Sequence, residues 1–235
     1  MTTLRLSAVL AIVAFAGCSS DTAKPVPLNL LSAGATQAIV QDEQATFTTQ
    51  SGITVDATYG AVGALRDMVI AGTPADVMIV TPAIITTLDG DHLVQANSRT
   101  DLGVIGGGLA VKAGAAMPDI STDAALMTLV DQLGIGDEVR AKGHTASGGA
   151  EAMQAMAASM AANPVGATQV SEILSVPQVT LVGEYPSDLQ VDTTYSAIIV
   201  EGTKQADEAQ QLVQFFVGAD FQARLAKSGF KPAPK

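Results

Sequence analysis

The chain of 235 residues has one cysteine, no tryptophan and only 4% aromatic residues. A single cysteine, Cys18, excludes an internal disulfide and a cysteine-rich metal site. The two histidines, His92 and His144, argue against a zinc site with three protein ligands, so we expect neither a metal nor another cofactor. The 12 basic and 23 acidic residues give a net charge of −11 and leave no basic surface for nucleic acid. The core must therefore consist of aliphatic side chains, alanine and methionine.

The first 26 residues have the pattern of a targeting segment. Residues 1–17 carry one charge, Arg5, and then an apolar run too short to span a membrane, as in a secretory signal peptide. The sequence Phe15-Ala-Gly-Cys18 resembles the lipobox of bacterial lipoproteins, which implies that Cys18 is acylated and anchors the mature chain to a membrane. Residues 18–26 then form a tether, and the protein is expected in the periplasm or on the cell surface. The alternative is an ordinary signal peptide cut elsewhere, with Cys18 incidental.

The segment Tyr59–Val80 predicts a glycine-bearing loop, a helix and a buried strand, in that order. Gly72 suits a left-handed position after the helix, and Pro74 prevents the helix from continuing. The apolar run Val77–Val80 is typical of a strand in a parallel sheet. A helix that begins directly after such a loop points free backbone N–H groups outward, which favours an anion site. An apolar stripe at helical spacing marks the buried face of this helix: Val62, Leu65, Met68 and Val69.

The same order of elements precedes this segment. An apolar strand from residue 27 ends at the small residues Ser32-Ala-Gly-Ala35, a helix is expected over 36–50, and residues 53–59 alternate as a strand does. Residues 27–80 thus predict a β-α-β-α-β unit with parallel strands and right-handed crossovers. The loops at 32–35 and 60–63 both open into helices and are both candidates for binding an anion through backbone N–H groups.

The remainder predicts a second α/β lobe and a return to the first. Glycines interrupt the strand-like run 101–112, as happens where a chain crosses between lobes. Residues 121–162 have the composition of helices, in which Met153, Met156 and Met160 would form a core stripe. Strands are expected around a short helix at 170–174, and a long strand at 191–200. Two amphipathic helices end the chain near Gly229.

These elements assemble into an expected pair of lobes. Residues 27–103 and 198–235 would form the first lobe, and residues 104–197 the second. The expected class is α/β, with mostly parallel sheets flanked by helices.

The sequence resembles the periplasmic substrate-binding proteins of the molybdate-binding type, which serve ABC importers and have the two-lobe type II fold. The resemblance lies in Leu30-Leu-Ser-Ala-Gly34, Gly63-Ala-Leu-Arg66, Ala71-Gly-Thr-Pro-Ala-Asp76, Val165-Gly-Ala-Thr-Gln-Val-Ser-Glu172 and 215–229. It implies that a monomer captures a small oxyanion between its lobes, without a counter-cation, and passes it to a permease. Ligand contacts would come from backbone groups and hydroxyls of residues in three loops: Ser32, Ala33, Gly34, Ala61, Val62, Gly63, Thr168, Gln169 and Ser171.

Substitutions in two loops argue against molybdate itself. The second loop has Ala61, Val62 and Gly63 where the molybdate binders have hydroxyl side chains, and Gln169 stands where they have tyrosine. The run Gln169-Val-Ser-Glu172 is instead similar to the aconitate-isomerase-like relatives, which implies a carboxylate ligand. If the chain is an isomerase of unsaturated tricarboxylates, Glu172 is the candidate general base. Arg66 would assist a carboxylate only if it faced the cleft, and the helix pattern places it on the polar side.

The sequence departs from the family at the second jaw of the cleft, the side that the second lobe contributes. Members of the family have a strand and a hydroxyl-rich loop before a helix in this lobe, and residues 126–135 show no such strand. Either that jaw is lost and the lobe is reduced, or the loop Gly143–Gly149 replaces it. Three hypotheses follow: an anion-binding receptor, an isomerase, and a degenerate binder without ligand.

Overall fold

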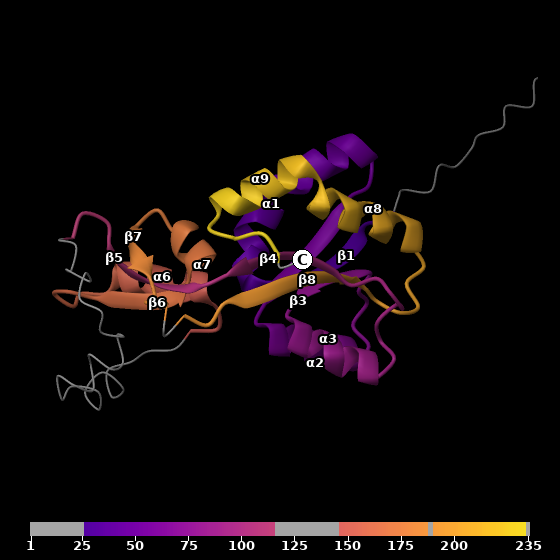
Figure 1. Cartoon of the computed structure of the whole chain (residues 1–235), viewed down its shortest axis with the longest axis horizontal. Helices are drawn as coiled ribbons and strands as arrows, with labels where there is room; N and C mark the ends of the chain where they lie inside the picture. The colour runs from indigo at the N-terminus through magenta and orange to yellow at the C-terminus, as the bar shows by residue number, and fades with distance from the viewer. Residues whose placement is uncertain (1–25, 116–145, 188–189, 234–235) are drawn as a thin grey trace, which may run out of the picture.

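The computed structural model describes residues 26–115, 146–187 and 190–233. These residues form two β-sheets with helices on their faces, joined side by side along the long axis of the molecule (Figure 1). The two-lobe α/β architecture agrees with the expectation from sequence. The targeting segment with Cys18 and the region 116–145 lie outside the described residues.

The first sheet has five strands in the order β2-β1-β3-β8-β4. The strands β1 (Leu28–Ala33), β2 (Val55–Gly60) and β3 (Val77–Val80) are parallel, as the sequence predicted. The strand β8 (Thr193–Ile199) runs antiparallel to β3 and to β4 (Thr100–Ile105). Every residue of β3 is buried, because β3 lies in the middle of a sheet that is covered on both faces.

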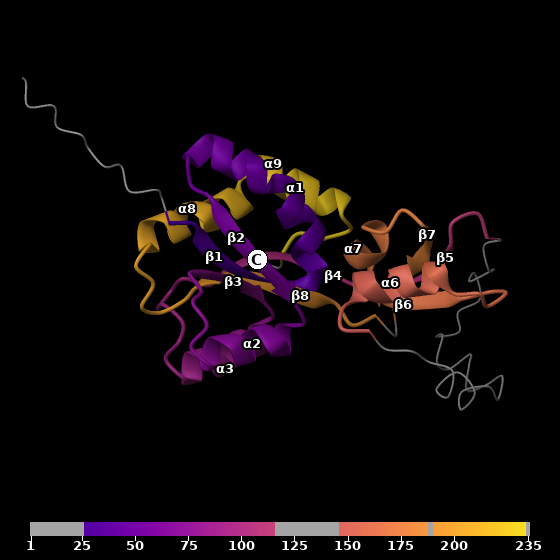
Figure 2. The ribbon, with the colours of Figure 1, turned by 180° about the vertical axis from the view of Figure 1, so that it is seen from behind.

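Helices cover both faces of this sheet. On one face lie α1 (Gly34–Ser51), α8 (Ala206–Val217) and α9 (Ala219–Lys227), and on the other lie α2 (Val62–Ile70) and α3 (Pro82–Gly90) (Figures 1 and 2). The first face carries the larger core, which includes all the buried phenylalanines. The predicted stop of α2 is confirmed, because Gly72 follows it with φ of 84°, in the left-handed region.

The second sheet has the order β6-β5-β7, and it is antiparallel rather than parallel as expected. Its strands are β5 (Gly107–Lys112), β6 (Val165–Gln169) and β7 (Val179–Glu184), and its described helices are α6 (Gly149–Ala158) and α7 (Val170–Leu174). The strands β6 and β7, which α7 connects, run the same way but pair on opposite sides of β5, so each contact with β5 is antiparallel. The methionine stripe is shorter than predicted: Met153 and Met156 are buried, but Met160 lies beyond the end of α6 and is 97% exposed.

The chain crosses between the two sheets twice. The first crossing is at Gly106, between β4 and β5, and the second lies between the end of β7 and the start of β8. Gln190, in the second crossing, is hydrogen-bonded to the end of the first crossing. Its side-chain oxygen accepts from the Gly107 N–H at 3.0 Å, and its side-chain nitrogen donates to the Gly107 carbonyl at 3.1 Å. We propose that the lobes divide at these crossings, a few residues from the boundaries expected at 103 and 198. Within the described ranges, no helix combines the length and apolar character needed to cross a membrane.

Candidate functional site

Two helix N-termini of the first lobe lie at the end of its sheet where the parallel strands β1 and β2 finish, which we call the cleft edge. The crossover through α1 leads from β1 outward to β2, and the crossover through α2 leads back past β1 to β3. The two helices therefore lie on opposite faces, and their N-termini meet at the carboxyl ends of the parallel strands. In open α/β sheets a ligand binds at such a reversal of strand order. Neither N-cap residue, Ala33 or Ala61, makes a side-chain hydrogen bond to its helix, so backbone N–H groups of both first turns face the cleft edge.

The structure places the predicted loops of the first lobe side by side, because Ala33 is paired with Gly60 across β1 and β2. Ser32, however, is fully buried, and its hydroxyl lies 2.7 Å from that of Thr36 inside the first turn of α1. The Ser32 side chain therefore fixes the start of α1. The backbone of Ala33 and Gly34 reaches the cleft edge, beside Ala61, which is exposed, and Val62 and Gly63, which are half-buried.

The second lobe faces the cleft edge with the end of β6 and the first turn of α7. Here Thr168 and Glu172 are joined, because the Thr168 hydroxyl donates to Glu172 Oε2 at 2.5 Å. The other carboxylate oxygen, Oε1, accepts from the backbone N–H of Gly149, the first residue of α6, at 3.1 Å. Glu172 also borders the first lobe, since a Cβ on Gly34 would lie 3.0 Å from Oε1. The Glu172 carboxylate therefore lies where the N-termini of α1 and α6 converge.

Gln169 and Tyr195 connect the two lobes. The Tyr195 hydroxyl, on β8, lies 3.1 Å from the side-chain oxygen of Gln169, at the end of β6. Burial raises the pKa of Tyr195 to about 12, and the negative charge of Glu172 acts in the same direction. Tyr195 thus stays a neutral O–H donor across the physiological range. This contact holds the Gln169 amide in one orientation at the cleft.

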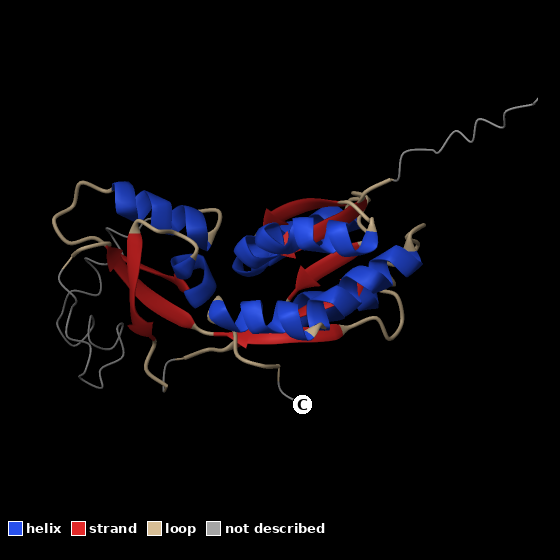
Figure 3. Cartoon of the chain, turned by 90° about the horizontal axis from the view of Figure 1, so that it is seen from above, coloured by secondary structure: helices blue, strands red, loops and turns tan. Residues whose placement is uncertain are grey.

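A hollow of about 640 Å³ lies along α1, next to residues that adjoin Glu172 but without Glu172 itself in its wall. Helices from both lobes line it, and Gly34 and Ser171 from the predicted set lie in its wall, together with Ala150. Ser171 is 3% exposed, and its hydroxyl has no hydrogen-bond partner among the described residues. A buried hydroxyl without a partner is costly, so the Ser171 hydroxyl would gain a hydrogen bond from any polar group that reached it. Seen from above, the two sheets follow one another along the long axis of the molecule, with helices packed against each (Figure 3).

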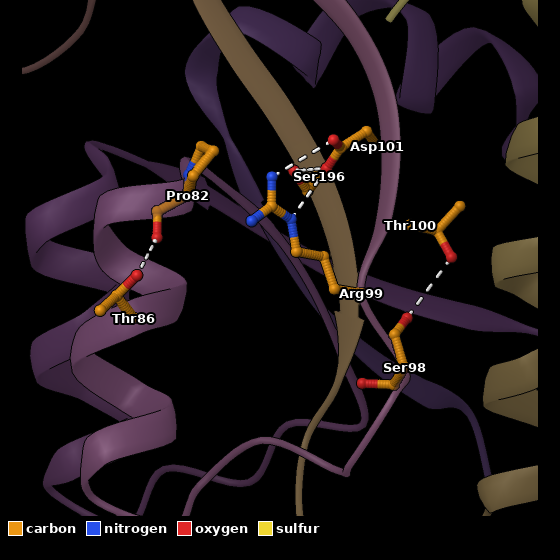
Figure 4. A network of polar contacts seen from close by, with 7 residues as sticks. All are labelled: Pro82, Thr86, Ser98, Arg99, Thr100, Asp101 and Ser196. Carbon is orange, nitrogen blue, oxygen red and sulfur yellow. Dashed lines mark hydrogen bonds and ion pairs between the residues drawn. The ribbon is translucent and has the colours of Figure 1, made fainter. Parts of the chain in front are cut away.

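Charged groups near the cleft are mostly engaged elsewhere. Arg66 pairs with its neighbour Asp67, in accord with the polar-side placement expected from the helix pattern. Arg224, at the rim of the hollow, pairs with Glu43 of α1. On the α2 and α3 side of the sheet, Arg99 donates to Asp101, which also accepts from Ser196 (Figure 4). The described residues contain no cluster of three or more His, Cys, Asp or Glu side chains that could hold a metal ion.

Sequence reasoning missed two participants, Gly149 and Tyr195. Gly149 lies at the described end of the loop 143–149 that was considered as a replacement jaw, and its N–H holds the Glu172 carboxylate. The signal available was a glycine directly before an alanine-rich helix. Tyr195 is contributed by a strand of the first lobe, and only the antiparallel pairing of β8 brings it to Gln169.

Comparison with known proteins identifies the family. A family model described as bacterial extracellular solute-binding protein matches residues 28–127 and 116–231. An aconitate isomerase of a Pseudomonas species is 28% identical over 237 residues, and the match covers 90% of each chain.

Solved structures show the same fold. The periplasmic molybdate-binding protein of Azotobacter vinelandii is 18% identical with a TM-score of 0.71, and the match covers 88% of this chain and all of that one. The substrate-binding domain of a putative molybdenum ABC transporter from Clostridium difficile is also 18% identical, with a TM-score of 0.64 and coverage of 88% and 99%. At this identity they establish the type II periplasmic-binding fold and nothing about the ligand.

Proposed function

Because the chain belongs to the family of bacterial extracellular solute-binding proteins, we propose that it captures a small carboxylate or oxyanion between its lobes for an ABC importer. One observation carries the proposal. The cleft already holds a carboxylate, that of Glu172, with the Gly149 N–H and the Thr168 hydroxyl as donors beside the N-terminus of α1. Those two donors are used by Glu172, and the first turns of α1 and α2 at the same cleft have no side-chain cap, so their backbone N–H groups are suited to the carboxylate or oxyanion of a ligand.

The remaining parts of the proposal follow from the family and the N-terminal sequence. We propose that the protein works as a monomer in the periplasm or at the cell surface, anchored through Cys18 and the tether of residues 18–26. Its partner would be the importer permease, which the loaded form would reach after the lobes close. A mass increase of lipid size at Cys18, measured on protein purified from membranes, would test the anchor, and a Cys18→Ala chain should be released into the soluble fraction.

Ligand binding is tested by thermal unfolding with a panel of carboxylates and oxyanions. A ligand that binds only the folded state stabilises it by RT ln(1 + [L]/Kd), about 2.7 kcal/mol at one hundred times Kd. We expect a rise in melting temperature for one chemical class and none for amino acids with a net positive charge. If no anion shifts the melting temperature at millimolar concentration, the degenerate-binder hypothesis replaces this proposal.

A second candidate function is isomerisation of an unsaturated tricarboxylate. It is favoured by the similarity to the Pseudomonas aconitate isomerase and by the position of Glu172 beside Tyr195 and Gln169 at the cleft. The reaction is a 1,3-shift: a base takes a proton from the methylene carbon, the electron pair of that C–H bond forms the new double bond, and the far alkene carbon takes up a proton. Glu172 would remove and return the proton, so the balance needs no co-reactant.

The isomerase hypothesis is tested by incubating the protein with cis-aconitate and following the isomer ratio. Glu172→Gln should lower the rate by at least about a hundredfold, because general acid–base catalysis contributes 10²–10⁴-fold. Glu151→Gln is the matched control, since Glu151 occupies the first turn of α6 and, among the described residues, its carboxylate accepts a hydrogen bond from Ser147 and from no other side chain. Binding of aconitate without isomerisation would leave the receptor function as the one supported.

A further inference from the structure

Glu172 lies in a slot that two glycines form. Gly34 is the first residue of α1 and Gly149 the first of α6, so the slot lies between the first turns of helices of 18 and 10 residues from different lobes. A Cβ on Gly149 would collide with the Glu172 carboxylate and the Thr168 hydroxyl, and a Cβ on Gly34 would come within 3.0 Å of Oε1. Both glycines therefore leave room for the carboxylate.

Backbone conformation does not explain these two glycines. Neither appears among the glycines with positive φ, so alanine would fit both backbones without strain. Alanine is also the better helix former at the first turn. What alanine would remove at Gly149 is the space that the Glu172 side chain occupies. Glycine at these two positions therefore keeps the Glu172 carboxylate in its place.

A carboxylate in this place changes which ligands the cleft accepts. An ionised carboxylate only accepts hydrogen bonds, and it already uses the Gly149 N–H and the Thr168 hydroxyl. A fully ionised tetrahedral anion arriving there meets a like charge and finds donors already used. A ligand that carries a hydroxyl or a protonated carboxyl group can instead donate to Glu172, in a charge-assisted hydrogen bond. Specificity of this kind comes from a built-in repulsion as well as from attraction.

We propose that Glu172 is a specificity-determining residue: it fills the anion position between α1 and α6, excludes tetrahedral oxyanions, and selects hydroxy- or partly protonated carboxylates. The inference rests on the proposed binding function. The hollow along α1 next to the slot gives the rest of such a ligand its space, since Gly34, Ala150 and Ser171 lie in its wall. The Ser171 hydroxyl is buried and has no partner among the described residues, and it can accept or donate once a polar group of the ligand reaches it.

The test measures the binding of sulfate and molybdate by calorimetry to the full mature chain and three variants. Glu172→Gln keeps the side-chain shape and removes the charge, and we expect it to bind at least one of these oxyanions about tenfold or more tightly than the parent, about 1.4 kcal/mol. Gly149→Ala displaces the carboxylate without touching Glu172 and should act in the same direction. Glu151→Gln is the matched control and should bind them as the parent does.

A matched pair of ligands tests the attractive side. Citrate and tricarballylate differ by one hydroxyl group, and the parent should bind citrate more tightly, whereas Glu172→Ala should bind the two equally. The inference is overturned if Glu172→Gln and Gly149→Ala both bind sulfate and molybdate no better than the parent, whether or not those variants keep the parent's melting temperature. Failure of the proposed function has a different signature, in which the parent binds no carboxylate and no oxyanion of the panel, whereas Glu172→Gln gains an oxyanion.

Discussion

The two lobes differ in how much core supports each face of the cleft. The first sheet has helices on both faces and two buried clusters, the larger of which includes Phe47, Phe216 and Phe221 in edge-to-face or tilted contact with one another or with Phe215. The second lobe, in its described part, has one small cluster of aliphatic and methionine side chains and no buried aromatic residue. We call the first lobe the platform, because it has the larger core, and the second lobe the jaw, because its described part has the smaller one.

The donors differ in the same way. The platform offers backbone N–H groups at the N-termini of α1 and α2, which no side-chain rotation can move. The jaw offers side chains, with Thr168, Gln169 and Glu172 on a short strand and a helix of five residues. Backbone groups recognise an anion in general, whereas side chains distinguish one anion from another. We therefore expect affinity to depend on the first lobe and selectivity on the second.

The largest expected effect is the loss of a platform side chain. Phe216 is 2% exposed in the larger core, so Phe216→Ala should lower the free energy of unfolding by about 3–5 kcal/mol through lost burial and the cavity left behind. Urea unfolding followed by circular dichroism measures this. The control is Val217→Ala, because Val217 is 37% exposed on the same helix and should change the value by less than about 1 kcal/mol.

A smaller and more local effect is expected in the jaw. Met153 is 1% exposed and lies against Gly166 of β6, and Met153→Ala should cost about 2–3 kcal/mol, the lower part of the usual range for such a truncation. Limited proteolysis should then cut the second lobe first, while the first lobe resists. Met160→Ala, at a position 97% exposed, is the matched control. Equal loss of protection in both lobes would contradict the distinction between platform and jaw.

The platform was also the part that the sequence predicted well. Residues 27–80 alternate strand and helix with clear stop signals, such as Gly52 and Gly72, and both glycines have the positive φ that such signals require. One helix of the platform, α3, was not predicted, and it follows directly after this segment. It begins with Pro82 at its first position, a known start signal, and continues with a stretch of weak pattern that contains Thr86 and Thr87. Local signals suffice where neighbours in sequence are neighbours in space.

The jaw and the cleft depend on long-range pairing, which single-sequence patterns do not encode. The strand β5 pairs with β6 and β7 across 50 to 80 residues of chain, and the pattern of 107–112 does not tell parallel from antiparallel partners. Glu172 was predicted as a residue near the ligand loops, but its contacts with Gly149 and Gly34 join three separate segments. The residue type was visible in the sequence, and its partners were not.

The contact between platform and jaw is tested at Tyr195. Tyr195→Phe removes the hydrogen bond to Gln169 and should cost about 1 kcal/mol at pH 8. Because burial raises the pKa of Tyr195 to about 12 in the folded protein, the unfolded chain loses this proton first as the pH rises. The stability that Tyr195 provides is therefore complete below pH 10 and is lost as the pH approaches 12, so the parent should weaken more than Tyr195→Phe between pH 8 and 11.

Tyr59→Phe is the matched control for this experiment. Burial also raises the pKa of Tyr59 to about 12, but its hydroxyl has no hydrogen-bond partner among the described residues. The variant should share the reduced sensitivity to alkali and lack the loss at pH 8. If both variants lose the same stability at pH 8, the bond between Tyr195 and Gln169 does not hold the lobes together.

The smallest expected effect lies at the start of β4, the outermost strand of the first sheet, where Arg99 and Asp101 pair beside Ser196 (Figure 4). Burial acts to raise the pKa of Asp101, but the hydrogen bonds from Arg99 and Ser196 and the charge of Arg99 outweigh it, so the pKa is lowered. The stability from this pair is present above the usual aspartate pKa and is lost as the pH falls through the lowered value. Arg99→Ala should lower the free energy of unfolding by less than about 1 kcal/mol at pH 7, because both groups are partly exposed. At pH 2 the loss should be smaller, because protonation of Asp101 removes the charge that Arg99 pairs with. Urea unfolding at the two pH values measures the difference, and Arg66→Ala, which breaks an exposed pair on α2, is the control. A loss as large at pH 2 as at pH 7 would show that Arg99 stabilises the edge strand through packing instead of charge.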